Sequence, residues 1–297
     1  RNCLDNPGAS SGLFEPGPRT FPGPVRKGLA ADEALLASED GTAPAPAEPD
    51  LHRVSPLLDG SSAQASEDLL GVDGLIAVAL EPDDHELERL VGIGRPVVSV
   101  VGDSDQTSVV GLDDVHAARR ATAHLVDLGH ERITFLGGIS DHEGPHVDRE
   151  RLSGYTSRMR DAGLRPDHAP SEVSLPGGYD VAVDLLSDPD RRPTAIVAAC
   201  DEVAIGAIIA ARRLGIAVPS ALSVVGIDNH EYSEMFGLTT LEQSPRGQGA
   251  AAARLLLDHL RSPGTERTQM RLHARLIVRG STSPPPGTPS VAVGVIP

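Results

Sequence analysis

Three side chains in the second half of the chain could together bind a small polar molecule. Arg151 lies near the start of a predicted helix, Asp228 ends the apolar segment SVVGID, and Cys200 ends the apolar segment TAIVAAC. A planar guanidinium donates several hydrogen bonds to hydroxyl or carboxylate oxygens, and a carboxylate accepts them from hydroxyl groups. An arginine and an aspartate therefore suit a polyhydroxylated ligand, and Cys200 is expected to line the same site without covalent chemistry.

Arg151 and Asp228 each have a purely structural interpretation as well. Arg151 could be a surface side chain that pairs with Asp148 or Glu150. Asp228 could cap a helix or form a turn before Asn229. The residue types alone leave both interpretations open.

Two further aspartates follow predicted strands. Asp103 follows the apolar segment PVVSVV, and ligands of open parallel sheets bind beyond the carboxyl ends of the strands, so Asp103 is a candidate ligand-binding residue. Asp201 opens the helix after Cys200. We expect it to be the N-cap of that helix, because an aspartate oxygen accepts hydrogen bonds from the free amides of a first turn.

The segment DHEGPHVD at residues 141–148 resembles a metal site in composition. His142 and His146 have a spacing that binds zinc when a helix places both rings on one face. Gly144 and Pro145 prevent such a helix, so we expect a polar loop and no metal. A metal-dependent hydrolase that uses these histidines is the weakest of three functional hypotheses.

The composition argues against several classes of protein. The 297 residues carry a formal net charge of −16, so we expect this chain alone not to bind DNA. Lys27 is the only lysine, which excludes a GxxxxGK[ST] phosphate-binding loop, and two cysteines exclude a disulfide scaffold. The sequence contains neither a long apolar stretch nor a basic start followed by an apolar run, which favours the cytoplasm and no membrane partner.

From about residue 62 the sequence alternates short apolar segments with segments of helical periodicity. Continuous apolar strands separated by helices indicate parallel sheets that are covered on both faces. Residues 1–60, by contrast, contain nine prolines and little periodicity, and a proline-rich tail begins at Ser283. We predict strands at 72–80, 96–101, 108–112, 132–136, 194–199, 223–227 and 271–279, and helices at 83–91, 114–128, 149–162, 178–186, 201–214 and 250–260.

Five segments occur in an order and at spacings that point to a known family. They are HLVDLGHERITFLGG (124–138), RLSGY (151–155), PTAIVAACDEVAIGAIIAARRLGIAVPSALSVVGIDN (193–229), LTTLEQS (238–244) and LIVRGST (276–282). Together they resemble the effector-binding region of the LacI/GalR family of bacterial transcriptional regulators. The resemblance covers residues 72–282.

The resemblance implies an α/β fold of two Rossmann-like parallel-sheet lobes with a ligand cleft between them, as in periplasmic binding proteins. Three segments would cross between the lobes, near 129–132, 241–245 and 272–279, and Gln243 would lie at one of them as a ligand-binding residue. The implied parts are an eroded start of the amino-terminal lobe (1–60), the rest of that lobe (61–130 plus 245–270), the carboxy-terminal lobe (131–243 plus 271–282) and a disordered tail (283–297).

The chain departs from the family pattern at several places. Neither a helix-turn-helix nor a hinge helix is visible, and the family's Asn-Pro-Phe turn is unrecognisable in residues 1–60. Cys200-Asp201 replaces a frequent Asn-Asp pair, and Ser174-Leu175-Pro176 lacks the aromatic residue that often stacks on the ligand. DNA binding would therefore require a helix-turn-helix that this chain does not contain.

The leading hypothesis is the sugar- or small-molecule-sensing core of a LacI/GalR-type transcriptional regulator. The resemblance implies that a sugar or nucleoside closes the cleft of a homodimer and modulates DNA binding allosterically, with no catalysis and no cofactor. The alternative is a solute-binding receptor of an uptake system, which shares the fold. No apolar segment precedes Cys3 as a lipid anchor would require, and the LIVRGST ending favours the regulator.

Overall fold

The computed structural model describes residues 72–78, 85–102, 104–138 and 145–287. The proline-rich segment 1–60 and Asp103 lie outside these described residues. All described residues belong to one compact unit, Asp59–Pro297. Among them, no helix is both long and apolar enough to cross a membrane.

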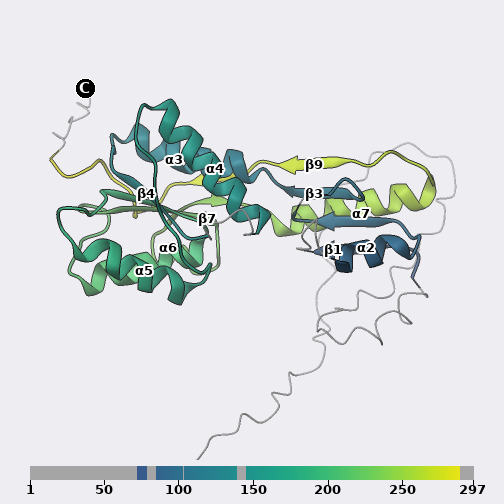
Figure 1. The fold of residues 1–297 in the computed structure, drawn as a ribbon, viewed down its shortest axis with the longest axis horizontal. Helices are drawn as coiled ribbons and strands as arrows, with labels where there is room; N and C mark the ends of the chain where they lie inside the picture. Colours follow the sequence, from purple (N-terminus) through teal and green to yellow (C-terminus); the bar gives the residue numbers. More distant parts are fainter. Residues whose placement is uncertain (1–71, 79–84, 103, 139–144, 288–297) are drawn as a thin grey trace, which may run out of the picture. The chain divides into compact units, whose positions relative to one another are not determined.

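A four-stranded parallel sheet, the smaller sheet, combines early strands with one strand from near the carboxyl end (Figure 1). Its lobe contains β1 (Leu75–Val78), α2 (His85–Gly92), β2 (Val97–Val100), β3 (Ser108–Leu112), α7 (Pro245–Arg261) and β9 (Gln269–Leu272). The strand order is β1-β2-β3-β9, and all three pairings are parallel. Strands β2 and β3 are buried along their whole length, which explains why they consist mainly of apolar residues. Ala251 and Ala252 of α7 pack on Val98, Val100 and Val110.

A six-stranded sheet, the larger sheet, forms the second lobe. It contains β4 (Ile133–Leu136), β5 (Asp167–Ala169), β6 (Ala195–Ala198), β7 (Ser223–Asp228), β8 (Thr239–Glu242) and β10 (Arg275–Ile277), in the order β10-β8-β7-β6-β4-β5. Its helices are α3 (Asp114–Asp127), α4 (His146–Asp161), α5 (Leu175–Ser187) and α6 (Asp201–Arg213). Only the pairing of β10 with β8 is antiparallel.

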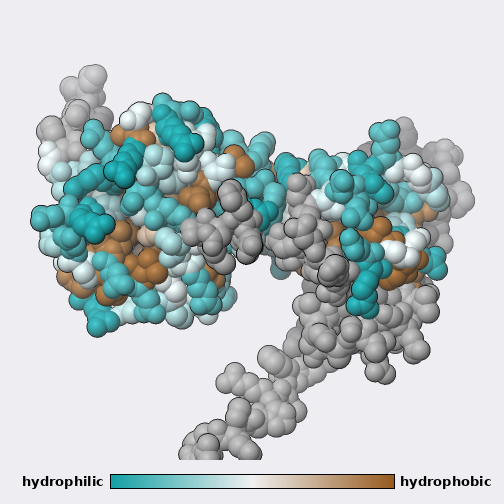
Figure 2. Space-filling model, in the orientation of Figure 1, coloured by the Kyte–Doolittle hydropathy of each residue, from teal (hydrophilic) through white to brown (hydrophobic). Residues whose placement is uncertain are grey.

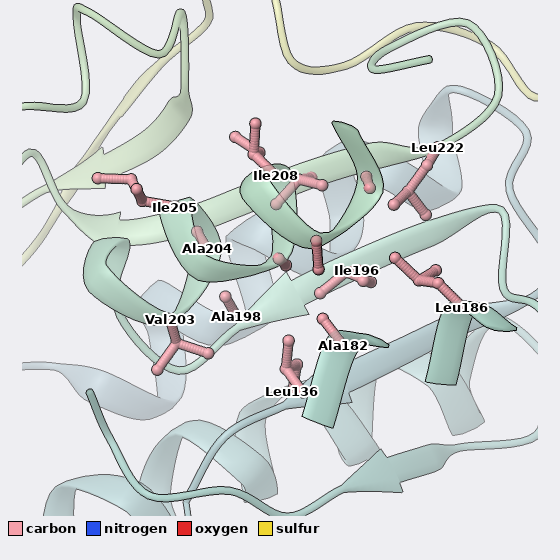
Figure 3. Packing of buried hydrophobic residues seen from close by; sticks show 14 of the residues in the cluster. Leu136, Ala182, Leu186, Ile196, Ala198, Val203, Ala204, Ile205, Ile208 and Leu222 are labelled. Carbon is pink, nitrogen blue, oxygen red and sulfur yellow. The ribbon is translucent and has the colours of Figure 1, made fainter. Parts of the chain in front are cut away.

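The larger sheet has a hydrophobic core on each face because successive side chains of its strands point to opposite sides. In β6, Ala195 and Val197 join α3 and α4 in one cluster, whereas Ile196 and Ala198 join α5 and α6 in the other. Figure 3 shows the second cluster, in which side chains of α5 and α6 meet those of the central strands. Two helices therefore cover each face, as Figure 1 shows.

The predicted α/β class with two parallel-sheet lobes is confirmed. Two strands of the larger sheet, β5 and β8, were not predicted. The single strand predicted at 271–279 is two strands, since β9 belongs to the smaller sheet and β10 to the larger. His273 and Ala274 lie at the crossing between them.

Helix α3 packs on the larger sheet. The family resemblance implied instead that residues 61–130, which include this helix, belong to the amino-terminal lobe. The apolar face of α3, which includes Ala117 and Leu125, belongs to the cluster that contains the β4 side chains. The chain therefore crosses between the sheets at residues 112–114 and not at 129–132. Periodicity predicted which side of the helix is apolar, but it carries no information on which sheet covers that side.

The segment after β10 is attached to the larger sheet. Ser281 Oγ donates to the Val224 carbonyl at 2.6 Å, and the Ser283 amide donates to Ser223 Oγ at 3.0 Å. The imidazole of His130 lies 2.8 Å from the Ser283 carbonyl. Ser283, the first residue of the predicted disordered tail, is thus fixed by hydrogen bonds, and the residues after 287 lie outside the described part.

Candidate ligand-binding site

The strand ends of the larger sheet bring the predicted site residues to one edge. Asp228 is the last residue of β7, and Cys200 follows β6. Arg151 lies in α4, and Asp114 is the first residue of α3. Parallel strands end at a common edge, and this edge is where open α/β sheets bind ligands.

A close crossing of α3 and α4 places the guanidinium of Arg151 at this edge. Gly154 lies one turn after Arg151, and a Cβ atom there would be only 2.2 Å from the Val115 carbonyl oxygen. The missing side chain lets the two helix backbones approach each other. Arg151 of one helix then reaches Asp114 of the other.

The guanidinium of Arg151 is buried and its donors are directed to acceptors of the protein. Nε donates to Asp114 Oδ1 at 2.7 Å, and Nη1 donates to the Ala199 carbonyl at 2.6 Å. Nη2 lies 3.5 Å from Asp228 Oδ1. Burial by itself would lower the pKa of Arg151, but Asp114 and Asp228 more than compensate and raise it. Arg151 is therefore a permanent buried cation and not the surface residue of the structural interpretation.

Asp228 has an unusual backbone and an unusual carboxyl group. Its φ is 131° and that of Asn229 is 59°, both in the left-handed region that non-glycine residues seldom occupy. Such strain is concentrated at functional sites. Burial raises the pKa of Asp228 to about 6; Arg151 opposes this rise, whereas Asp201 and Asp114 add to it. The carboxyl therefore titrates close to neutral pH.

Gln243 orients the carboxyl of Asp228. Its Nε2 donates to Asp228 Oδ1 at 2.7 Å, and its Oε1 accepts from Gln248 Nε2 at 3.3 Å. Gln248 is buried in α7, the helix that covers the smaller sheet. The segment between β8 and α7 therefore links a residue of the predicted site to the other lobe.

Cys200 lies beside these charges and carries a protonated thiol. It is the N-cap residue of α6, although its side chain does not cap the helix. Burial raises the pKa of the Cys200 thiol to about 11. The thiol therefore stays protonated at neutral pH. That Cys200 lines a ligand site stays a prediction.

Asp201 does not cap the helix as expected, because Cys200 holds that position. Its fully buried carboxylate accepts hydrogen bonds from the His230 amide at 2.9 Å, from Thr240 Oγ1 at 2.6 Å and from Ser233 Oγ. These partners belong to β8 and to the segment after Asn229. Asp201 therefore holds the strand end that carries Asp228.

The structure brings together Arg151, Asp228, Cys200 and Gln243, four of the five predicted ligand-binding residues. The fifth, Asp103, lies outside the described residues, as does His142 of the segment considered for a metal. Within the described residues, no group of three or more histidine, cysteine, aspartate or glutamate side chains could hold a metal ion.

Two residues that contact the predicted site residues, Asp114 and Gln248, were not predicted from the sequence. Asp114 did carry a signal, because the pair Asp113-Asp114 directly follows a predicted strand. Gln248 carried none, since its role depends on how α7 packs. At the start of α5, where an aromatic residue was missing, Ser174 accepts from the Gly177 amide and Leu175 packs against the core.

Comparisons with known proteins define the class of this fold and site. The family model described as "Periplasmic binding protein-like domain" matches residues 122–282, more than half of the chain. The chain belongs to this family. Within it, the chain corresponds to the effector-binding region of LacI/GalR-type regulators.

Two curated relatives illustrate the match. The transcriptional regulator DegA of Bacillus subtilis is 34% identical over 224 residues, which cover 72% of this chain and 65% of the relative. The regulator MalR of Streptomyces coelicolor is 34% identical over 234 residues, covering 73% of this chain and 66% of the relative. The chain thus spans slightly less than two thirds of the length of these relatives.

Solved structures of LacI-family regulators share the fold. One from Mycobacterium smegmatis has 31% identity and a TM-score of 0.64, with 75% of this chain and 86% of that chain covered. One from Enterococcus faecium with bound ribose has 28% identity and a TM-score of 0.65, with 74% and 84% covered. The lac repressor dimer bound to operator has 27% identity and a TM-score of 0.65, with 74% and 78% covered.

Proposed function

We propose that this chain is the effector-sensing core of a cytoplasmic LacI/GalR-type transcriptional regulator and that it has no catalytic activity. Its effector is a small polyhydroxylated compound, a sugar or a nucleoside. The observation that carries the proposal is the buried Arg151, held 3.5 Å from the half-buried Asp228 at the strand-end edge of the larger sheet.

The polar groups at this edge suit hydroxyl ligands. Asp228 accepts hydroxyl protons, and the Nη2 group of Arg151 donates to ring or hydroxyl oxygens. Among the described residues at this edge, the Cys200 thiol is protonated and Arg151 is permanently charged, so neither is an activated nucleophile, which supports a binding role. Related structures titled with ribose and with cellobiose support a sugar as the ligand class.

Effector binding acts on DNA through the lobes of a homodimer. Ligand contacts at Asp228 favour the closed arrangement of the two lobes, and Gln243 and Gln248 carry the contact to α7. A difference in binding free energy of about 1–3 kcal/mol between the two states is enough for such coupling. DNA itself is bound by a helix-turn-helix like those for which the curated relatives are named.

Calorimetric titration tests the site assignment. The chain is titrated with a panel of sugars and nucleosides, and the binding compound is then titrated into Arg151→Ala and Asp228→Ala. Loss of a hydrogen bond to a charged partner costs about 1.5–3 kcal/mol, so we expect affinity to fall roughly ten- to a hundred-fold.

Asp161→Ala is the matched control for these titrations. Asp161 pairs with Arg119 on the exposed surface, and its loss should leave affinity unchanged. Thermal unfolding of each variant checks that it is folded. Normal binding by both site variants, in folded form, would contradict the assignment.

The alternative function, a solute-binding receptor of an uptake system, uses the same fold and the same site. The curated relatives named above are helix-turn-helix regulators, which favours the sensor. The gene sequence upstream of Arg1 separates the two functions. An in-frame helix-turn-helix establishes the regulator, and a secretory leader establishes the receptor.

A further inference from the structure

The positive charge of Arg151 is already balanced within the protein. Both side chains of the Arg151–Asp114 ion pair are less than 10% exposed, and their atoms are 2.7 Å apart. A second donor group is occupied by the Ala199 carbonyl. Little of this guanidinium is therefore left to neutralise a carboxylate or phosphate of a ligand.

The charges around Asp228 are predominantly negative. Arg151 acts on the Asp228 carboxyl as a cation, whereas Asp201 and Asp114 act on it as anions. Two carboxylates, Asp114 and Asp228, contact the single guanidinium of Arg151, and Asp201 adds a further anion on the side of Asp228. The Asp228 side chain is 29% exposed, so a ligand can reach this surplus negative charge.

From this charge distribution we infer that the site selects a polyhydroxylated ligand carrying a protonated amine, such as an amino sugar, with the ammonium group placed against Asp228. The inference rests on the proposed function, because it assumes that the site at Asp228 binds the effector. It adds to that function the charge that the ligand must carry. Asp114 determines this charge, because it pairs with Arg151 and neutralises the guanidinium.

The physical reason is the low dielectric constant of a half-buried site. An ammonium group beside Asp228 gains a charge-assisted hydrogen bond and reduces the repulsion among the carboxylates. A neutral sugar gains only hydroxyl hydrogen bonds. A sugar acid or sugar phosphate adds another negative charge, and Arg151, whose donors are already directed to Asp114, Ala199 and Asp228, is not available to neutralise it, so we expect the site to reject it.

Matched series of compounds test the inference by calorimetry at pH 6.5. The probes are glucosamine, glucose, gluconate and glucose 6-phosphate, then galactosamine with galactose, and glucamine with sorbitol. We expect the amine of at least one series to bind at least tenfold tighter than its neutral parent, and the anions to bind more weakly still.

Variants assign this preference to Asp228. In Asp228→Asn the amine and its neutral parent should bind with similar affinity, whereas Asp190→Asn, a change on the exposed surface, should keep the wild-type preference. In the wild type, amine binding should also release protons near pH 6, which titrations in buffers of different ionisation heat measure. Its affinity should rise several-fold between pH 5.0 and 6.5 as Asp228 ionises.

The outcomes separate the inference from the proposed function. If neutral or anionic compounds bind as tightly as the amines in every series that binds, the inference is overturned and the sensor function stands. If no compound of the sugar and nucleoside panel or of the amine series binds at millimolar concentration, the proposed function is overturned and the inference with it.

Discussion

Asp228 is held in a state that costs free energy in the absence of a ligand. Its carboxyl is surrounded by Asp114 and Asp201, and its backbone lies in the left-handed region. The surrounding structure must hold Asp228 in this conformation. It does so through the hydrogen bond from Gln243 and through the pairing of β7 with β8. These supports hold a preformed hydrogen-bond acceptor at the strand end.

Replacing Asp228 should stabilise the protein at neutral pH. The folded-state pKa of about 6 lies above the ordinary value of 3.8, so the folded state binds this proton more tightly than the unfolded state. The stability that this proton contributes is complete below about pH 4 and is lost as pH rises through 6. Asp228→Asn should therefore raise Tm at pH 7.5 by several degrees and change it little at pH 4, as measured by differential scanning fluorimetry.

The control for this pH dependence is Asp190→Asn on the exposed surface, which should leave Tm unchanged at both pH values. A lower Tm for Asp228→Asn at pH 7.5 would contradict the assigned direction of the pKa shift. It would mean that the ionised carboxylate contributes more to stability through Arg151 than its burial costs.

Asp201 should be a structural residue. Its loss leaves buried donors of Thr240 and Ser233 and the His230 amide without an acceptor. Each unsatisfied buried group costs about 1–3 kcal/mol, so Asp201→Ala should lower the free energy of unfolding by about 3 kcal/mol or more. Urea unfolding measures the change, with the exposed neighbour Glu202→Ala as control. Equal stability of the two variants would refute the role.

The sequence predicted single residues of the site better than their contacts. Arg151 and Asp228 were identifiable because Arg151 lies in the helix after a predicted strand and Asp228 ends another, each in a recognisable segment. The partner Asp114 lies 37 residues before Arg151 and reaches it only through the crossing of α3 and α4. No local pattern contains that crossing, so the neutralisation of Arg151 could not be predicted.

At the level of elements, long helices and fully buried strands were predictable and short edge strands were not. The segment of β6 is apolar throughout, and that of β7 is apolar between Ser223 and Asp228, since both faces of these strands are covered. Strand β5 has the sequence DHA and β8 has TTLE, neither of which is apolar enough to indicate a strand. Their neighbours in the sheet supply the hydrogen bonds that make them strands.

The crossing of α3 and α4 should tolerate no side chain at residue 154. Gly154→Ala places a methyl group against the Val115 carbonyl, a backbone atom that cannot move aside without separating the helices. We expect a loss of stability of about 2 kcal/mol or more. The change should also weaken ligand binding, because it moves Arg151 away from Asp114. Chemical denaturation and calorimetry measure the two effects.

Gly249→Ala is the matched control for the crossing. Gly249 lies on the exposed side of α7, and no neighbouring atom lies within 4 Å of the position that an alanine methyl group would take. Alanine is a better helix former than glycine, so this change should stabilise by about 0.5–1 kcal/mol. A destabilised Gly249→Ala or a neutral Gly154→Ala would contradict the close-packing explanation.

At the scale of the whole molecule, the surface offers a place for a second copy of the chain. The end of α6 lies beside the segment 232–236, because the Arg212 guanidinium is 5.3 Å from the Phe236 ring, and Leu214, which follows α6, is exposed. Tyr232 and Met235 are 49% and 79% exposed. Figure 2 shows hydrophobic atoms reaching an otherwise mostly hydrophilic surface in this lobe.

We expect a homodimer that uses this apolar surface. The double variant Leu214→Asp, Met235→Asp should shift the chain towards monomer, because it places charges in the contact. Val173→Asp, which changes an exposed apolar residue elsewhere, should leave assembly unchanged. Analytical ultracentrifugation at micromolar concentration measures the association. A monomeric wild type, or a double variant that assembles normally, would contradict the expectation.

The pairing of β3 with β9 has a consequence for synthesis on the ribosome. Ser108 and Thr268, which are hydrogen-bonded at the start of this pairing, lie 160 positions apart in the chain. At about 5–20 residues per second, the ribosome needs roughly 8–30 seconds to deliver the second strand after the first. The strands of the larger sheet, apart from β10, are translated within that interval. The three strands of the smaller sheet that emerge first therefore wait for β9 until all but one strand of the larger sheet has been made, and their valine side chains stay without the cover of α7 for most of that time.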